Sequence, residues 1–179
     1  MIQIGIVVFR EALEVALVAA LLLAATRGIP GRGLWFLAGL VGGAAGAGVV
    51  ALFAEAITAA LAGRGQDLFN AAVLSVTVVM VAWTIAWMRK HGATLAREAV
   101  ATGERIRSGQ APLYLLAVTV GVAVLRDGSE LVVFLSALSL SGQMTLPGIV
   151  GGFLAGGVAG TAIGALIYYG VLRAGIGDA

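Results

Sequence analysis

The stretch "VVFREALEVALVAALLLAA" (residues 7–25) decides the fold, because it combines the length of a membrane-crossing helix with three charged side chains. A helix needs about 20 apolar residues to cross the hydrocarbon core of a bilayer. Arg10, Glu11 and Glu14 interrupt this run near its middle. A charged side chain at a helix centre costs roughly 2.5–3.5 kcal/mol on insertion scales. We therefore expect a membrane helix whose charges serve a function.

The rest of the chain also has the composition of an integral membrane protein. Of its 179 residues, 60% are hydrophobic and 11% are charged, against about 25% charged in soluble domains. It has no cysteine, and its one histidine, His91, lies in a polar segment, which argues against a soft-metal site. No basic n-region or cleavage site accompanies the first apolar run, so we interpret it as a mature span and not as a signal peptide. Nothing in the sequence indicates a nucleic-acid partner.

Five long apolar segments predict an all-α, polytopic membrane helix bundle. Glycine, proline and polar residues separate the segments, which cover residues 2–26, 34–62, 68–89, 112–141 and 147–172. The loops that would share one side of the membrane hold eight basic residues: Arg27, Arg32, Arg89, Lys90, Arg97, Arg105, Arg107 and Arg173. The opposite loops hold only Arg64. Because basic residues stay inside, we expect a multi-pass protein of the plasma (inner) membrane with its N-terminus outside.

The two halves of the chain resemble each other in sequence. "VVFREALEVALVAALLLA" (7–24) is similar to "AVLRDGSELVVFLSALSL" (123–140), and "GLVGGAAGAGVVAL" (39–52) to "GIVGGFLAGGVAGT" (148–161). The second copy starts after three spans, so it would be inverted in the membrane, as in many transporters with a midplane site. We predict one membrane domain, made of a three-helix repeat (1–91), a cytoplasmic linker (92–111) and a partial, two-helix repeat (112–179).

The repeat doubles the charged motif, as "REALE" (10–14) and "RDGSE" (126–130). Each motif falls on one face of its helix, within about 100° of arc. In a purely structural interpretation, each arginine would pair with the glutamate four residues later and the charges would only hold the helices together. However, each motif has two acids for one arginine, so it keeps a net negative charge after this pairing. Carboxylates without sulfur or imidazole favour a hard cation. The predicted ligands are Glu11, Glu14, Asp127 and Glu130, supported by Arg10 and Arg126.

These paired motifs resemble the Arg-Glu-x-x-Glu motifs of the oxidase-dependent ferric iron permeases, the iron/lead transporter family. The likeness continues through "GRGQDLFNAAVLSVTVVMVAWTIAWMRKH" (63–91), which is similar to the third span of that family. The resemblance implies uptake of ferric iron across a plasma membrane, with the motif carboxylates as ligands and no tightly bound cofactor. It also implies a partner oxidase or periplasmic protein that delivers iron.

The sequence departs from the family pattern at three places. Asp127 stands where the family usually has Glu, and Asn70 stands where its third span tends to carry a second acid. The family resembles a seven-span protein, whereas this sequence ends where the second repeat would begin its third helix. We expect a gap there that another subunit, such as a second copy in a homo-oligomer, could close.

Two further acids and one polar segment have alternative interpretations. Glu55 is either an outer station on the cation path or a side chain that snorkels to the interface. Asp67 is either part of the same outer path or the N-cap of the third span. The segment 89–109 predicts a solvated or lipid-surface helix on the inner side.

Two other functions compete with a permease. An intramembrane enzyme acting on lipid phosphates could use the arginines for phosphate and the glutamates as acid and base, with Ser129 or Ser136 as nucleophile. A non-transporting accessory subunit would fit the shortened second repeat. We expect a cation permease and no enzymatic activity.

Overall fold

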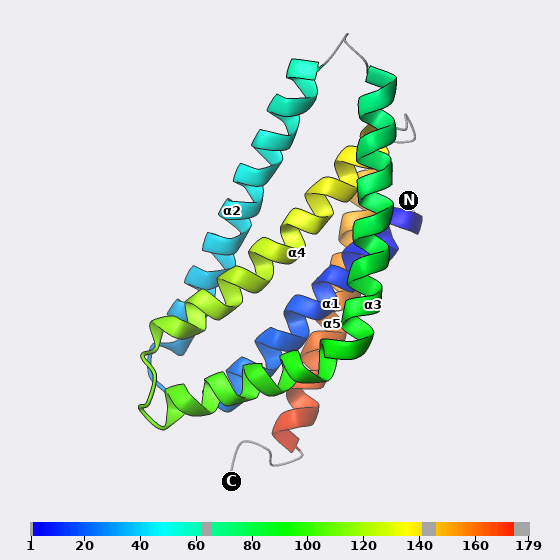
Figure 1. Cartoon of the computed structure of the whole chain (residues 1–179). Coiled ribbons are helices and arrows are strands. Elements are labelled where there is room, and N and C mark those ends of the chain that lie inside the picture. The colour runs from blue at the N-terminus through cyan, green and yellow to red at the C-terminus, as the bar shows by residue number, and fades with distance from the viewer. Residues whose placement is uncertain (1, 62–65, 141–145, 174–179) are drawn as a thin grey trace.

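The computed structural model describes residues 2–61, 66–140 and 146–173, which form five helices and no strand (Figure 1). The helices are α1 (Ile2–Ala25), α2 (Arg32–Leu61), α3 (Gln66–Arg107), α4 (Tyr114–Leu140) and α5 (Leu146–Arg173). The predicted all-α class is therefore confirmed. Four helices match the predicted apolar segments to within two residues at each end, and the third is much longer than expected.

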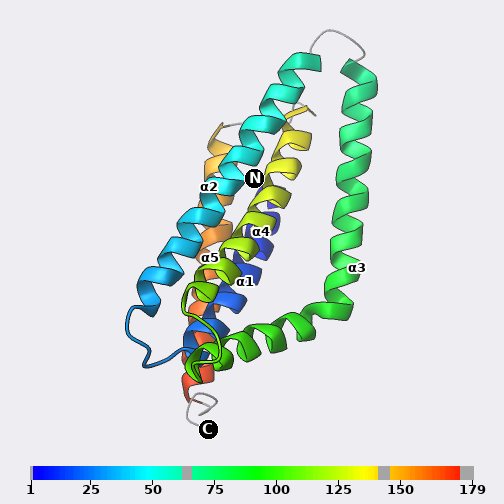
Figure 2. The same ribbon diagram turned by 60° about the vertical axis from the view of Figure 1, so that its left-hand side comes forward.

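Helix α3 continues through the segment that was predicted to be a separate linker. Its backbone is helical as far as Arg107, so the predicted boundary between residues 91 and 92 lies inside the helix. Figure 2 shows that α3 changes direction sharply and that its second arm runs back toward the other helices. Ala99 and Ile106 on this arm are buried in a cluster with Leu22 of α1 and Leu116 of α4. One face of this arm packs on the bundle and the other is exposed, so its position at the solvent or lipid surface remains a prediction.

Glycine seams hold the helices together in two pairs, α1 with α5 and α2 with α4. A Cβ atom added to Gly156 of α5 would lie 2.5 Å from the carbonyl oxygen of Gly5 on α1. Likewise, a Cβ added to Gly43 of α2 would lie 2.6 Å from the carbonyl oxygen of Gly121 on α4. The backbones thus meet directly, as small residues allow in membrane helices.

The two motif helices run in opposite directions. In Figure 1, α1 and α5 descend from the end of the bundle marked N, whereas α2 and α4 ascend toward it. Each helix therefore packs in parallel on its glycine-seam partner, whereas α1 and α4 pack antiparallel.

Two helices of the described part are long and apolar enough to cross a membrane, by length and composition alone: Arg32–Ile57 within α2 and Pro147–Gly170 within α5. Helices α1 and α4 have the length, but each carries three charged residues near its middle. Large apolar side chains cover the outside of α2 and α5, including Leu52 and Leu166, which are 67% and 70% exposed. Such continuous apolar exposure fits contact with lipid.

Candidate functional site

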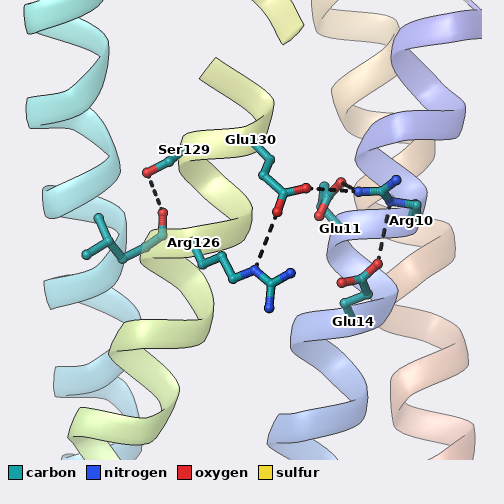
Figure 3. Close-up of polar contacts among 7 residues, drawn as sticks. Arg10, Glu11, Glu14, Arg126, Ser129 and Glu130 are labelled. Carbon is teal, nitrogen blue, oxygen red and sulfur yellow. Dashed lines mark hydrogen bonds and ion pairs between the residues drawn. The ribbon is translucent and has the colours of Figure 1, made fainter. Parts of the chain in front are cut away.

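The charged motifs of α1 and α4 meet between the two helices (Figure 3). On each helix, the i, i+1, i+4 spacing places the motif residues on one face, and the antiparallel packing sets the two motifs against each other. The two motifs thus lie at the same level of the bundle.

Arg10 connects the two motifs. Its Nη2 donates to Oε1 of Glu11 at 2.6 Å and to Oε2 of Glu130 on α4 at 3.1 Å, and its Nε lies 3.5 Å from Oε1 of Glu14. Arg126 donates from Nε to the other oxygen of Glu130, at 3.4 Å. Both ion pairs between residues four apart therefore occur, but the link from Arg10 to Glu130 goes beyond them because it ties α1 to α4.

Three carboxylates from both motifs form a compact cluster. Glu11, Glu14 and Asp127 each offer an oxygen, and these oxygens lie within 4.8 Å of one another. Glu11 and Asp127 are only 3% and 6% exposed. Oε2 of Glu11 is buried with no hydrogen-bond partner among the described residues. A buried carboxylate oxygen without a donor is costly, and a cation between these oxygens would satisfy it.

Glu130 differs from the other three predicted ligands. Each of its oxygens faces an arginine, Arg10 on one side and Arg126 on the other. It is therefore committed to ion pairs, whereas the sequence alone treated the four acids as equivalent. The two arginines and four acids leave the site with a formal net charge of −2 when all are ionised, which favours a cation.

Two cavities adjoin the cluster. The first, of about 570 Å³, lies between the two helix pairs and has mostly apolar walls, with Glu11 and Asp127 among its lining residues. The second, of about 340 Å³, is lined by residues of α1, α3 and α4 that include Glu14 and Asp127. Asp127 thus lines both cavities.

The acids predicted for an outer path are not part of this cluster. Glu55 is exposed on α2 and lines neither cavity. The backbone of Asp67 lies in the first turn of α3, and its side chain is outside the described residues, as is that of Asn70. An outer path through Glu55 and Asp67 remains a prediction.

The sequence reasoning missed the contribution of the second arm of α3. Glu98 lines the second cavity together with Leu95, Ala99 and Thr102. These residues recur every three or four positions, which is the spacing of one helix face. That periodicity was the available signal, but the high charge of the segment concealed it.

The two serines that an enzymatic reading requires hydrogen-bond to their own helix. The Ser129 hydroxyl donates to the carbonyl oxygen of Leu125 at 2.6 Å, on the side of α4 away from the carboxylates (Figure 3). The Ser136 hydroxyl donates to the carbonyl oxygen of Val132 at 2.9 Å. Neither hydroxyl donates to a carboxylate that could act as its base, as nucleophilic catalysis would require.

Comparison with known proteins gives a family and several distant relatives. The model of the iron permease FTR1 family matches residues 1–177. The chain is 28% identical over 176 residues to the ferrous iron permease EfeU of Escherichia coli O6:H1, covering 96% of this chain and 63% of that protein. It is also 28% identical over 172 residues to the ferrous iron permease EfeU of Yersinia pestis, covering 94% and 60%. The chain thus spans less than two thirds of the length of these relatives. No solved structure matches it.

Proposed function

Because this chain belongs to the iron permease FTR1 family and is a membrane protein, we propose that it carries iron across the plasma membrane through the carboxylates between α1 and α4. The observation that carries this proposal is the cluster of Glu11, Glu14 and Asp127, whose oxygens lie within 4.8 Å of one another. A cluster that joins both motifs offers an ion one site and not two.

We propose ferric iron as the preferred ion. Carboxylate oxygens are hard ligands and favour hard cations, and the described part of the site offers neither sulfur nor imidazole. The relatives compared above are named as ferrous iron permeases, so the oxidation state needs its own test. An oxidase or an iron-delivery protein outside the membrane would supply the ferric ion.

We also propose that the chain forms an inverted repeat with five spans and an outside N-terminus. The opposite directions of α1 and α4 support this, as does the exchange of partners between the halves. The first helix of each half packs on the second helix of the other, α1 on α5 and α4 on α2. Inverted repeats of this kind place a substrate site at their interface.

The experiment is iron uptake into proteoliposomes that contain the purified chain. We expect uptake of ⁵⁵Fe³⁺ to exceed that of ⁵⁵Fe²⁺ kept under anaerobic reduction, and uptake of copper(I) to stay at the level of empty vesicles. Glu14→Gln and Asp127→Asn should each abolish uptake, whereas Glu104→Gln, on the exposed face of α3, should not.

Two results would contradict the proposal. A wild-type chain that inserts and folds but moves no iron would favour an accessory subunit. Release of phosphate from lipid would favour the enzyme.

A further inference from the structure

The second cavity forms a vestibule beside the carboxylate cluster. It lies along the C-terminal half of α1 and the N-terminal half of α4, and the second arm of α3 forms its third wall. Its polar side chains come from all three helices: Glu14, Glu98, Thr102, Thr119, Arg126 and Asp127. We call this cavity the α3 vestibule.

The α3 vestibule is the polar approach to the cluster. Two of the three cluster carboxylates, Glu14 and Asp127, line it, while Glu11 lines the first cavity. The walls of the first cavity are mainly alanine, valine and leucine side chains, which cannot replace the hydration shell of an ion. An ion leaving the cluster therefore finds oxygen ligands on the vestibule side.

We propose that Glu98 forms a second cation station in the α3 vestibule and receives the ion from Glu14 and Asp127. Among the described lining residues, Glu98 is the one carboxylate outside the two motifs. It is exposed, and no ion pair engages it among the described residues. This inference rests on the proposed function, since it extends the path of the same ion.

Hydroxyl oxygens complete the ligand set of the station. Thr102 lies four residues after Glu98 and so shares its helix face. Thr119 stands on the α4 wall and donates its hydroxyl hydrogen to the carbonyl oxygen of Leu115 at 2.9 Å. The lone pairs of that hydroxyl remain as acceptors. Carboxylate and hydroxyl oxygens suit the same hard cation as the cluster.

The charges favour passage through the station and release from it. Three acids, Glu14, Asp127 and Glu98, and one arginine, Arg126, line the vestibule, which gives a formal net charge of −2. Arg126 pairs with Glu130 at the motif end. A lone carboxylate holds an ion less tightly than the cluster, and transport needs sites weak enough to release their ion.

The test counts the metal ions bound by the purified chain and by its variants, and measures iron uptake by each of them. Tb³⁺ serves as a hard trivalent probe that takes oxygen ligands. We expect wild type and Glu104→Gln to bind one tight and one weaker equivalent, and Glu98→Gln to keep only the tight one. We also expect Glu98→Gln to slow ⁵⁵Fe³⁺ uptake by about tenfold or more, the scale of effect for residues that support a metal site.

A weaker Tb³⁺ equivalent that survives in Glu98→Gln would overturn the station. Loss of that equivalent with uptake equal to that of Glu104→Gln would overturn its place on the path. Different results would overturn the proposed function. One is tight Tb³⁺ binding that persists in the double variant Glu14→Gln and Asp127→Asn, and the other is a wild-type chain that moves no iron. In either case, loss or survival of the weaker Tb³⁺ equivalent in Glu98→Gln still shows whether Glu98 binds a cation.

Discussion

The guanidinium of Arg10 on α1 reaches the carboxylate of Glu130 on α4 at 3.1 Å, while it also pairs with both acids of its own motif. One arginine thus orients acids on two helices. It also holds positive charge beside the oxygens that an incoming cation would need. Binding of an ion must therefore loosen some of these pairs, so Arg10 both shapes the site and competes for it.

Replacing Arg10 with lysine tests the geometric role of the guanidinium. An arginine fork engages several carboxylate oxygens at fixed geometry, whereas an ammonium acts as a point charge. We expect Arg10→Lys to weaken Tb³⁺ binding by about 10–100-fold, as loss of a supporting group typically does, with little change in thermal stability. Arg126→Lys is the matched comparison and should cost less, because the 3.4 Å pair of Arg126 with Glu130 is longer than the 2.6 and 3.1 Å contacts of Arg10. Normal transport by Arg10→Leu would contradict this geometric role and would mean that the arginines only balance the charge of the acids.

Charge removal within the cluster should be non-additive. Residues that serve one ion act as a unit, so Glu14→Gln and Asp127→Asn should each bring iron uptake nearly to background, and the double variant should be scarcely worse. Glu130→Gln should reduce binding less, because both oxygens of Glu130 already face arginines. Uptake and thermal stability are measured with and without Fe³⁺. Multiplicative losses would indicate two independent sites.

Removing a cluster charge should not destabilise the metal-free protein. An amide in place of a buried carboxylate removes a desolvation cost. We therefore expect the melting temperature of Asp127→Asn without metal to equal or exceed that of wild type, and stabilisation by added Fe³⁺ to be lost. A large drop in melting temperature without metal would mean that Asp127 is a structural group.

Binding should weaken in acid. Protonation neutralises a carboxylate and makes it a donor, so it no longer attracts a cation. A titration of Tb³⁺ affinity from neutral to mildly acidic solution should show a steady loss in wild type. The Glu14→Gln and Asp127→Asn double variant should show little residual binding at any pH. An affinity that is constant with pH would argue against carboxylate ligands.

The glycine seam gives a matched pair of alanine substitutions on α5. In Gly156→Ala the new methyl group would meet the backbone of Gly5 and Phe9 at 2.5 and 2.8 Å, and overpacking of this kind costs about 1–3 kcal/mol. Gly157→Ala meets nothing within 4 Å. We expect the melting temperature of Gly156→Ala to fall below that of wild type and the melting temperature of Gly157→Ala to stay unchanged. Equal melting temperatures would contradict the direct backbone contact.

The topology can be tested because these 179 residues include no cysteine. Ser108 is exposed just after α3, so Ser108→Cys offers a reporter on the predicted inner side. An impermeant thiol reagent should label it only after the membrane is opened. Labelling in intact cells would reverse the orientation.

The sequence predicted the elements that depend on local patterns. Apolar length predicted the helices, and the spacing of the doubled motif predicted that each set of charges occupies one face of its helix. The pattern could not separate Glu130 from the other acids, because its partner Arg10 lies 120 positions away in the sequence and their pairing depends on how α1 packs against α4.

The path of α3 was also beyond prediction. Polar composition marked residues 92–111 as a linker, yet Ala99 and Ile106 are buried against α1 and α4. Tertiary packing thus overrode composition in this segment. For the same reason, the sequence did not show that Glu98 lines a cavity together with Glu14.

The pairing of α1 with α5 also determines the order in which this protein can assemble. Helix α1 is made well before the helix that fills its glycine seam, since α1 begins at Ile2 and α5 at Leu146. During synthesis, Arg10 therefore lacks its ion pair with Glu130 until α4 has been made, and α1 lacks its packing partner until α5 has been made. The sequence repeat is thus not a unit of biogenesis, since a separately synthesised half would lack the surface against which its first helix packs.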